Sequence, residues 1–409
     1  MNMTFPYGSS SECRLALDDC THLAAERHAH PPVADPIGAV RRALAEPQGY
    51  PPLATATVPG DRVVLALGVG VPQPHGLLLG AVAAVVDAGV EPTDITIVST
   101  AKIEDRDRLE QELAVAGSTG VRFEVHDPDD EPAIAMVGVT SAGTPLRLNR
   151  TIAEADLVVP IGVSQTVNIE GLQAPKFSGL FPQFSDRDTQ DLFQAGKDET
   201  PKQLAKRIAA IDEAGWLLGI GMTVSVVPGA GGAVAAVLAG EPAAVAKVAD
   251  ERRRAIWERE AKSPGDLVVA AVLGDQREQT WDNLGAALRA AERVLLPDGV
   301  IAVLTELSEP PPETFDRLRE AVDFEDVQRV LARETGEGVA PALALAHALE
   351  RGPVYLRSRL PADLVESIGM TPIESDAELS RLAAGRDHTV VIEEAQRIVP
   401  RLSSANARP

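Results

Sequence analysis

The sequence is poor in aromatic residues and in cysteine. Phe, Trp and Tyr together make up only 3% of the chain, so Ala, Val and Leu must fill the core, and pockets lined by stacked rings are not expected. The two cysteines, Cys13 and Cys20, are too few for a disulfide framework or a four-cysteine zinc site. Such cysteine usage is typical of a reducing compartment, so the expected location is the cytoplasm.

The chain also has little positive charge, with 38 Lys and Arg against 60 Asp and Glu and a formal net charge of -22. Nucleic acids and anionic membrane surfaces attract basic surfaces, so neither is expected as a partner. Residues 1–10 have no basic stretch followed by an apolar run, so no signal peptide is expected. The apolar run 77–86 is too short to cross a bilayer. The expected partner is a small molecule, and the sequence leaves the oligomeric state open.

Hydrophobic runs and helical patterns alternate from residue 62 onward. Strands are predicted over 62–67, 94–99 and 121–125, and helices over 76–88 and 104–116. Repeated strand–helix–strand units of this kind predict an α/β fold with a mostly parallel sheet. Its connections should be right-handed, and helices should cover both faces of the sheet.

The middle of the chain is less regular. Residues 134–139 and 144–148 flank a Ser-Ala-Gly turn and predict a hairpin, and a buried strand is predicted over 156–161. Residues 162–190 then show no clear period, although their hydrophobic residues indicate an ordered segment. A long irregular segment inside a compact domain is often functional.

Two helix starts and one boundary organise the rest of the chain. Thr200-Pro201 predicts a capped helix start, strands return within 216–227, and Glu241-Pro242 opens a helix expected to reach about residue 260. Ser263-Pro264-Gly265 predicts a boundary between domains 1–262 and 263–409, leaving open a return of the last strand to the first domain. A second α/β cycle is predicted from strands at 267–273, 300–305, 354–356 and 389–392 and helices at 281–294 and between 312 and 350.

Several short motifs then occur in an order that resembles one family. They are Phe-Pro-Tyr-Gly near the start, VADPIGAVRRALAEP at 33–47, PGDRVVLAL at 59–67, His-Asp at 126–127, SAGTPLRLNRTIAEADLVVPIG at 141–162, AAVLAGEPAAV at 235–245, PDGVIAVLTE at 297–306 and IVPRL at 398–402. Together they resemble the lactate racemase family over nearly the whole chain. The resemblance implies two α/β domains that face a cleft.

The same resemblance implies a specific chemistry. Members of this family hold a nickel pincer nucleotide on a lysine, bind its metal with a histidine, and racemise 2-hydroxy acids with two further histidines. Each of these positions can be compared with the present sequence. In the loop after the first strand, the expected acid and arginine fall on Gly68 and Val71. The first catalytic histidine falls on Ile103, and the second on Val167 or Asn168.

The remaining family positions also differ. Residues 186–196, where the metal-binding histidine is expected, contain no histidine, and Lys176 meets the lysine position only with a one-residue deletion. Proton abstraction beside a carboxylate needs a positioned base, usually histidine. Lys176 and His75 are the remaining candidates for catalytic groups. No metal site and no cofactor are predicted, although the family cofactor would be the nickel pincer nucleotide.

Other polar or small residues are candidates for ligand binding. Gly68 and Gly70 leave space at the end of a strand, and Lys102 follows the neighbouring strand and could face an anion. The spacing of the glycines does not match a dinucleotide fingerprint, because the third position is Gln73. The further candidates are Gln165, Thr166, Asn168 and Glu170 in the irregular segment, and Gln276, Glu278, Trp281 and Asn283 where the family contacts its cofactor.

One more cluster of potential ligands is set aside. Cys20-x-His22 and His28-x-His30 match no standard zinc spacing, and the family places this stretch in a surface linker before the first helix.

The sequence therefore predicts a diverged, cytoplasmic pseudoenzyme of the lactate racemase type. We expect its interdomain cleft to bind a small polar or anionic ligand without the nickel cofactor. Two alternatives remain open. One is a 2-hydroxy-acid racemase or epimerase with a rebuilt site that uses Lys176 and His75, and the other is a non-catalytic interaction scaffold.

Overall fold

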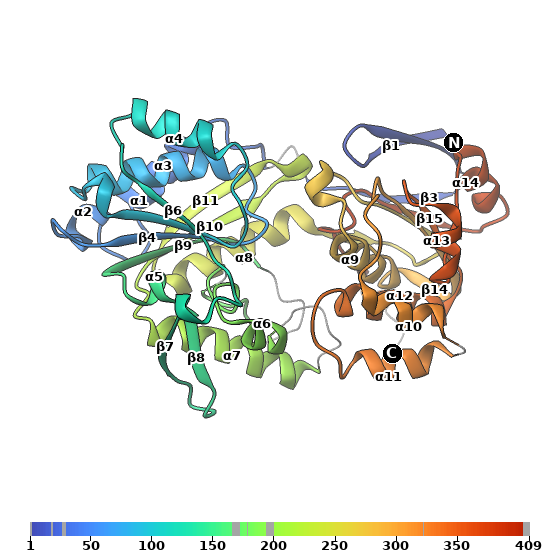
Figure 1. The fold of residues 1–409 in the computed structure, drawn as a ribbon. Coiled ribbons are helices and arrows are strands. Elements are labelled where there is room, and N and C mark those ends of the chain that lie inside the picture. Colours follow the sequence, from blue (N-terminus) through green and yellow to red (C-terminus); the bar gives the residue numbers. More distant parts are fainter. Residues whose placement is uncertain are drawn as a thin grey trace. The chain divides into compact units, whose positions relative to one another are not determined.

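A computed structural model describes residues 2–17, 19–26, 30–165, 172–177, 179–193, 200–321 and 323–403. The chain divides into two compact units, coloured by sequence in Figure 1. We call residues 30–193 and 200–255 the central unit, because both ends of the chain belong to the other one. That other unit, the terminal unit, comprises residues 2–26 and 256–403.

This division differs from the expected domains in two respects. The boundary lies after residue 255, within α8 (Pro242–Trp257), rather than after residue 262, and residues 258–261 form strand β12. The first 26 residues belong with the second half of the chain. Strand β18 (Val399–Leu402) pairs with β12 (Glu258–Ala261), so the last strand stays in the terminal unit.

The central unit is built on a six-stranded sheet with the order β11-β10-β9-β4-β5-β6. All neighbouring strands are parallel except β10 and β11, which form an antiparallel pair at one edge. The predicted α/β fold class is therefore confirmed. The strands are β4 (Val63–Leu67), β5 (Ile95–Ser99), β6 (Arg122–Val125), β9 (Leu157–Val163), β10 (Thr223–Pro228) and β11 (Val234–Gly240).

The alternation of side chains along β4 produces the two cores of this unit. Val63, Leu65 and Leu67 point to a core shared with α1 (Pro36–Ala45), α3 (Pro74–Asp87) and α4 (Arg106–Val115). Val64 and Ala66 point to the opposite core, which includes residues of α5 (Arg150–Ala153) and α7 (Pro201–Leu217). Figure 1 shows the two sets of helices on opposite sides of the sheet.

Residues 172–177 and 179–185, which are described parts of the irregular segment, contribute to this second core. Phe177, Leu180, Phe181 and Phe184 are all buried there, against strand and α7 side chains. The prediction of order from these hydrophobic residues is confirmed. The segment is joined to the hairpin β7 (Ile134–Val139) and β8 (Pro145–Asn149) by a bridge between Leu148 and Ser185.

The terminal unit has a second six-stranded sheet, with the order β16-β15-β14-β13-β17-β3 and all neighbouring strands parallel. The edge strand β3 (Cys20–Leu23) lies beside β17 and is not the surface linker that was expected there. The other strands are β13 (Gly265–Ala271), β14 (Leu295–Leu304), β15 (Val354–Arg357), β16 (Thr371–Pro372) and β17 (Thr389–Ile392).

A hairpin at the start of the chain covers part of this sheet. Strands β1 (Asn2–Tyr7) and β2 (Ser11–Ala16) place Phe5, Cys13 and Leu15 in one core with residues of β13 and β14. The remaining helices of this unit are α9 (Trp281–Glu292), α10 (Asp316–Arg319), α11 (Phe324–Leu331), α12 (Val339–Arg351), α13 (Ala362–Ser367) and α14 (Asp376–Ala383), and the central unit adds the short α2 (Leu53–Ala56) and α6 (Arg187–Leu192). Across the described residues, no helix has both the length and the apolar character to cross a membrane.

Candidate functional site

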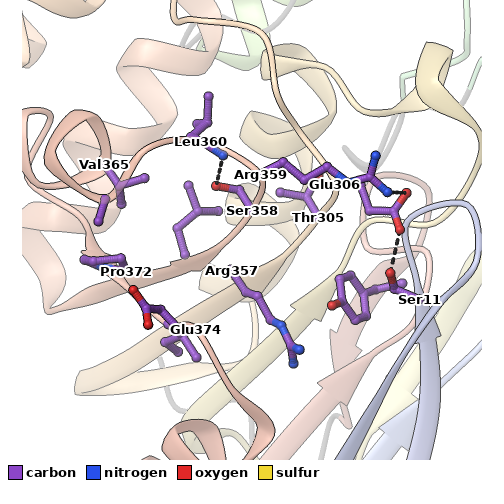
Figure 2. A pocket seen from close by; sticks show the side chains of 14 residues that line it. Ser11, Thr305, Glu306, Arg357, Ser358, Arg359, Leu360, Val365, Pro372 and Glu374 are labelled. Carbon is purple, nitrogen blue, oxygen red and sulfur yellow. Dashed lines mark hydrogen bonds and ion pairs between the residues drawn. The ribbon is translucent and has the colours of Figure 1, made fainter.

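A pocket opens at the carboxyl ends of β14, β15 and β16 in the terminal unit, with a volume of about 290 Å³ (Figure 2). Ligands of open α/β sheets bind at this end, because the loops that follow the strands converge there. The polar lining residues are Tyr7, Ser11, Thr305, Glu306, Arg357, Ser358, Arg359 and Glu374, and the apolar ones are Leu356, Leu360, Ala362, Val365, Pro372 and Ile373.

Glu306 is the most completely bonded side chain of this pocket, and only 4% of it is exposed. Its Oε2 accepts hydrogen bonds from the backbone N–H of Ser9 at 3.1 Å and from the Ser9 hydroxyl at 2.8 Å. The Ser11 hydroxyl donates to Oε1 at 2.5 Å, and Arg359 Nη2 lies 3.1 Å from Oε2. Burial alone would raise the pKa of Glu306, but these bonds and the nearby Arg359 charge lower it overall. Glu306 is therefore a buried carboxylate that fixes Arg359.

Arg357 is fixed in a similar way by an acid outside the pocket. Its guanidinium pairs with Asp376 of α14 and lies 5.2 Å from the centre of the Tyr7 ring. Asp376 also accepts a hydrogen bond from the backbone N–H of Arg14. Although burial would raise the pKa of Asp376, the bond from Arg357 and the other donors lower it overall. Both arginines of the pocket are thus held in place by ionised carboxylates.

The one cysteine near this pocket is not a nucleophile. Cys13 is fully buried and lies beside Asp376. Burial, with the neighbouring negative charge, raises the pKa of its thiol to about 12. Because the thiolate is the reactive form, Cys13 stays inert at neutral pH. Cys13 therefore supplies no reactive thiol to this pocket.

The side chains predicted to bind a ligand in the terminal unit contact other residues of the same unit. Trp281 is 6% exposed, and its Nε1 donates to the carbonyl oxygens of Glu309 and Pro310. Its ring packs against Phe315, with ring centroids 4.6 Å apart. Trp281 is therefore part of the packed core and does not offer a free ring face to a ligand. Asn283 donates to the Glu278 backbone and side chain, Glu278 pairs with Arg397, and Gln276 donates to Ser308 at 3.3 Å.

The space beside Gly68 in the central unit is filled by the chain itself. A Cβ atom at Gly68 would lie 2.9 Å from the Cα of Gly179, and the next backbone N–H, of Val69, donates to the Gln183 side chain at 2.9 Å. Gly70 has a φ of +73° with open space around it, and Gln73 has a φ of 50° at the start of α3. The small residues at this strand end therefore allow residues 179–183 to approach closely.

The two predicted catalytic candidates lie with helices of opposite faces of the central sheet. His75, at the start of α3, has its Nε2 3.1 Å from Oε2 of Glu112 on α4. Lys176 has its Nζ 3.5 Å from Oδ2 of Asp212 on α7. Because α3 and α4 share one core and α7 the other, the described contacts give His75 and Lys176 no common centre. Lys102, also a candidate, is exposed.

Lys176 and Gln165 both line a second, much smaller cavity of about 10 Å³. Such a volume holds about one water molecule. Ser164, which also lines it, is buried and its hydroxyl has no hydrogen-bond partner among the described residues, which fits a bound water there. The remaining predicted contacts of this segment, Thr166, Asn168 and Glu170, lie outside the described residues.

The residues around Lys176 do not fit a nickel-bound nucleotide. Nickel in proteins takes imidazole, thiolate or similar donors, and the lining of the cavity beside Lys176 offers none. The sequence 166–171, next to Gln165, contains no histidine or cysteine either. In the described parts of the chain, no three His, Cys, Asp or Glu side chains gather as a metal site.

His22, His126 and His388 are each hydrogen-bonded or ion-paired to a neighbouring residue of their own unit. His22 pairs with Glu393 at 2.8 Å, and His388 Nδ1 lies 2.9 Å from Asp19. His126 donates from Nε2 to the Ser185 carbonyl at 2.8 Å, and burial lowers its pKa, so that it is held neutral. These imidazoles connect strands and loops within each unit.

The comparison with known proteins agrees with this fold. Residues 7–168 match the family model of the lactate racemase N-terminal domain. The lactate racemase apoprotein from Thermoanaerobacterium thermosaccharolyticum is similar over 98% of this chain and 100% of that chain, with a TM-score of 0.75 and 19% sequence identity. The chain has the lactate racemase fold. The resemblance predicted from the short motifs is thereby confirmed.

A second solved structure extends the comparison. A protein from Thermotoga maritima covers 90% of this chain and 99% of its own, with a TM-score of 0.62 and 12% identity. No curated protein matches the sequence. At these identities the two solved structures show the lactate racemase fold alone, and the activity of this chain has to be argued from its own residues.

Sequence reasoning missed the pocket of the terminal unit. Its main polar residues come from the start of the chain, from the end of β14 and from the loop after β15, so they are distant in sequence. One local signal was present, because Arg357-Ser358-Arg359 directly follows a predicted strand. Glu306 also ends the motif PDGVIAVLTE that carried the resemblance, at the end of another strand.

Proposed function

We propose that this chain binds a small polar or anionic molecule and does so without the nickel cofactor of lactate racemases. It does not racemise hydroxy acids. One observation carries the proposal: Lys176, which meets the family lysine position only with a one-residue deletion, is paired with Asp212 beside a cavity with no imidazole donor and room for about one water. The chain retains the fold but not the groups that perform the family chemistry.

The energetic argument concerns the missing bases. Racemisation removes a proton from one face of a carbon and returns it on the other, so it needs two positioned acid–base groups. Each such group contributes about 10²–10⁴-fold to the rate. Gly68, Val71 and Ile103 stand at positions where the family has polar or basic groups. Their side chains supply neither a base nor a charge for a carboxylate.

Co-expression with the enzymes that make the nickel pincer nucleotide tests this proposal. We expect the purified chain to contain no stoichiometric nickel by elemental analysis and no mass increase by intact mass spectrometry. D-lactate should not convert to L-lactate in a chiral assay. The matched control is Lys176→Ala, which should give the same nickel content and mass as the wild type after correction for the substitution.

Two results would contradict the proposal. One is a nucleotide adduct or bound nickel that is present in the wild type and lost in Lys176→Ala. The other is interconversion of lactate enantiomers that depends on Lys176 or His75. The binding part of the proposal is tested separately, by mass spectrometry of small molecules released from the denatured protein. A second measure is the thermal stabilisation that a ligand of the native state must cause.

A further inference from the structure

We propose that the pocket at the ends of β14, β15 and β16 binds a small carboxylic acid with an apolar body. In this proposal Arg359 contacts the carboxylate, and the apolar residues around α13 contact the body. The inference deepens the proposed function, since it names a site and a ligand class for the binding that was inferred above. It lies wholly within the terminal unit.

The first step of the argument is the orientation of Arg359. A guanidinium has five N–H donors in a rigid fork, and a single edge of this one is engaged by Glu306 at 3.1 Å. More than half of the Arg359 side chain, 58%, is exposed, so further donors remain available for a ligand. Arginine held in this way binds carboxylates well, because its planar fork matches two carboxylate oxygens.

The second step is the role of Glu306. A buried carboxylate with one charge partner and three hydrogen bonds from Ser9 and Ser11 cannot turn toward solvent without losing these bonds. Because Glu306 is fixed by the β1–β2 hairpin, Arg359 is fixed as well. A preorganised side chain loses less conformational entropy when a ligand binds. The hairpin thereby prepares the pocket for an anionic group.

The third step is the separation of polar and apolar side chains. Figure 2 shows Arg359, Glu306 and Ser11 on one side of the view and Val365 and Pro372 on the other. Glu374, the one exposed acid of the lining, lies on the side of Pro372, away from Arg359. A ligand that fits this arrangement has an anionic head at Arg359 and a hydrocarbon body.

The size of the pocket limits the ligand. Pockets for small molecules usually span about 300–1,000 Å³. The present pocket, about 290 Å³, lies just below this range. This size favours a short-chain acid over a dinucleotide or a long lipid. Both arginines have a carboxylate partner, but the Arg357 side chain is only 21% exposed against 58% for Arg359, so Arg359 is the arginine that we assign to the ligand.

The experiment uses isovalerate as the probe, with acetate, isovaleramide and inorganic phosphate for comparison. Binding to the full chain is measured by ligand-observed NMR and by titration calorimetry. We expect a Kd for isovalerate of about 1 mM, the range of a small ligand with one strong ionic contact. Acetate should bind about tenfold more weakly because it lacks the buried methyl groups. Isovaleramide should also bind about tenfold more weakly because it has lost the charge-assisted bonds.

Arg359→Gln should weaken isovalerate binding about tenfold, because one charge-assisted contact is lost. The matched control is Arg381→Gln, which makes the same charge change at a side chain of α14 that is 77% exposed and outside the pocket lining. It should bind isovalerate as the wild type does. Arg359→Lys keeps the charge but not the fork, and it should give an intermediate affinity.

Several outcomes would overturn the inference. These are no detectable binding of isovalerate at several millimolar, equal binding of isovalerate and isovaleramide, or equal affinities of Arg359→Gln and Arg381→Gln. Phosphate binding more tightly than isovalerate would reassign the pocket to a phosphate group. If Arg359→Gln does not fold, the comparison of acid with amide on the wild type still decides. Failure of this inference would not change the expected results of the nickel and lactate assays, whereas failure of the proposed function would appear in those assays and in the mass spectrometry of released small molecules.

Discussion

The ends of the two parallel sheets differ in what covers them. In the central unit, residues 179–183 lie against the carboxyl ends of β4 and β9, and a Cβ atom at Gly179 would come within 2.5 Å of the Cα of Gly162. In the terminal unit, the ends of β14, β15 and β16 border a pocket of about 290 Å³. The strand ends of the central sheet are thus packed against backbone, whereas the strand ends of the terminal sheet border a pocket.

This difference shows what glycines at the end of a strand can and cannot indicate. Gly68 leaves space for a close neighbour, and in this chain the neighbour is Gly179 of the same polypeptide. The open pocket has no glycine among its lining residues and is instead bordered by arginine, serine and glutamate side chains from four separate segments. Glycines at a strand end allow another segment or a ligand to approach the backbone closely. Charged side chains held in place at such an end indicate the chemical class of the ligand.

The largest expected effect comes from removing one buried aromatic side chain beneath the end of the central sheet that residues 179–183 cover. Phe184 is fully buried and packs in the second core of the central unit, with His126 at 5.7 Å between ring centres. Phe184→Ala should lower the free energy of unfolding by about 3–5 kcal/mol, because a large buried side chain is replaced by a cavity. Urea unfolding followed by circular dichroism measures this change.

The control for Phe184→Ala is Trp216→Ala, since Trp216 is also aromatic and in the central unit but is 74% exposed. Its substitution should change the free energy of unfolding by less than about 0.5 kcal/mol. Similar costs for the two variants would mean that residues 172–185 are not a packed cover of the sheet. The contrast between the two sheet ends would then be lost.

Most of the fold could be predicted from local patterns. The apolar runs located β4, β5, β9 and β17, and Thr200-Pro201 gave the start of α7, where Thr200 and Gln203 form a capping box. The pairing of β3 with β17 could not be predicted. These strands are more than 360 residues apart in the chain, and their short sequences do not specify a partner.

The candidate site was harder to predict for the same physical reason. Glu306 and Arg359 meet only because β14 and β15 are neighbours in the sheet, and Ser9 meets Glu306 only because the first hairpin packs on that sheet. No period or spacing in the sequence encodes these contacts. By contrast, the hydrophobic residues of the segment 162–190 predicted order, but the sequence did not reveal that residues 172–177 and 179–185 contribute to the core.

The next largest effect concerns the charged wall of the open pocket. In Glu306→Gln, the amide can accept fewer of the hydrogen bonds that now come from Ser9, Ser11 and Arg359, and its NH₂ group faces their donors. We expect a loss of about 1–3 kcal/mol in the free energy of unfolding at pH 7. Denaturant unfolding at a series of pH values measures it.

The pH dependence of this loss follows from the lowered pKa of Glu306. A carboxyl whose pKa is lowered by folding stabilises the protein above its unfolded value, near 4.5, and this contribution disappears as the pH falls through the folded value. The difference in the free energy of unfolding between wild type and Glu306→Gln should therefore be constant near neutral pH and should decrease in acid. Glu374→Gln, the same change at an exposed position of the same pocket, should cost less than about 0.5 kcal/mol at any pH. A difference that does not narrow at all as the pH falls below 4.5 would contradict the assignment of an ionised Glu306.

The smallest expected effect on stability comes from Lys176→Ala in the central unit, and it tests directly whether the two units act separately. Lys176 is 43% exposed, and its ammonium lies 3.5 Å from Asp212, which also accepts a 2.8 Å hydrogen bond from the Lys176 backbone N–H. Lys176→Ala keeps the backbone bond and removes only a solvated ion pair, so it should cost at most about 1 kcal/mol. Asp212→Ala removes both interactions and should cost about 1 kcal/mol more.

Lys176→Ala should also leave the affinity for isovalerate unchanged, because Lys176 belongs to the central unit and the pocket to the terminal unit. Calorimetric titration of this variant beside Arg359→Gln gives the comparison within one experiment. If Lys176→Ala weakens binding as much as Arg359→Gln does, a single ligand depends on both units, and the two sheet ends cannot be treated as separate. If only Arg359→Gln weakens it, Lys176 has no part in binding this acid, and the contact belongs to Arg359 in the loop after β15.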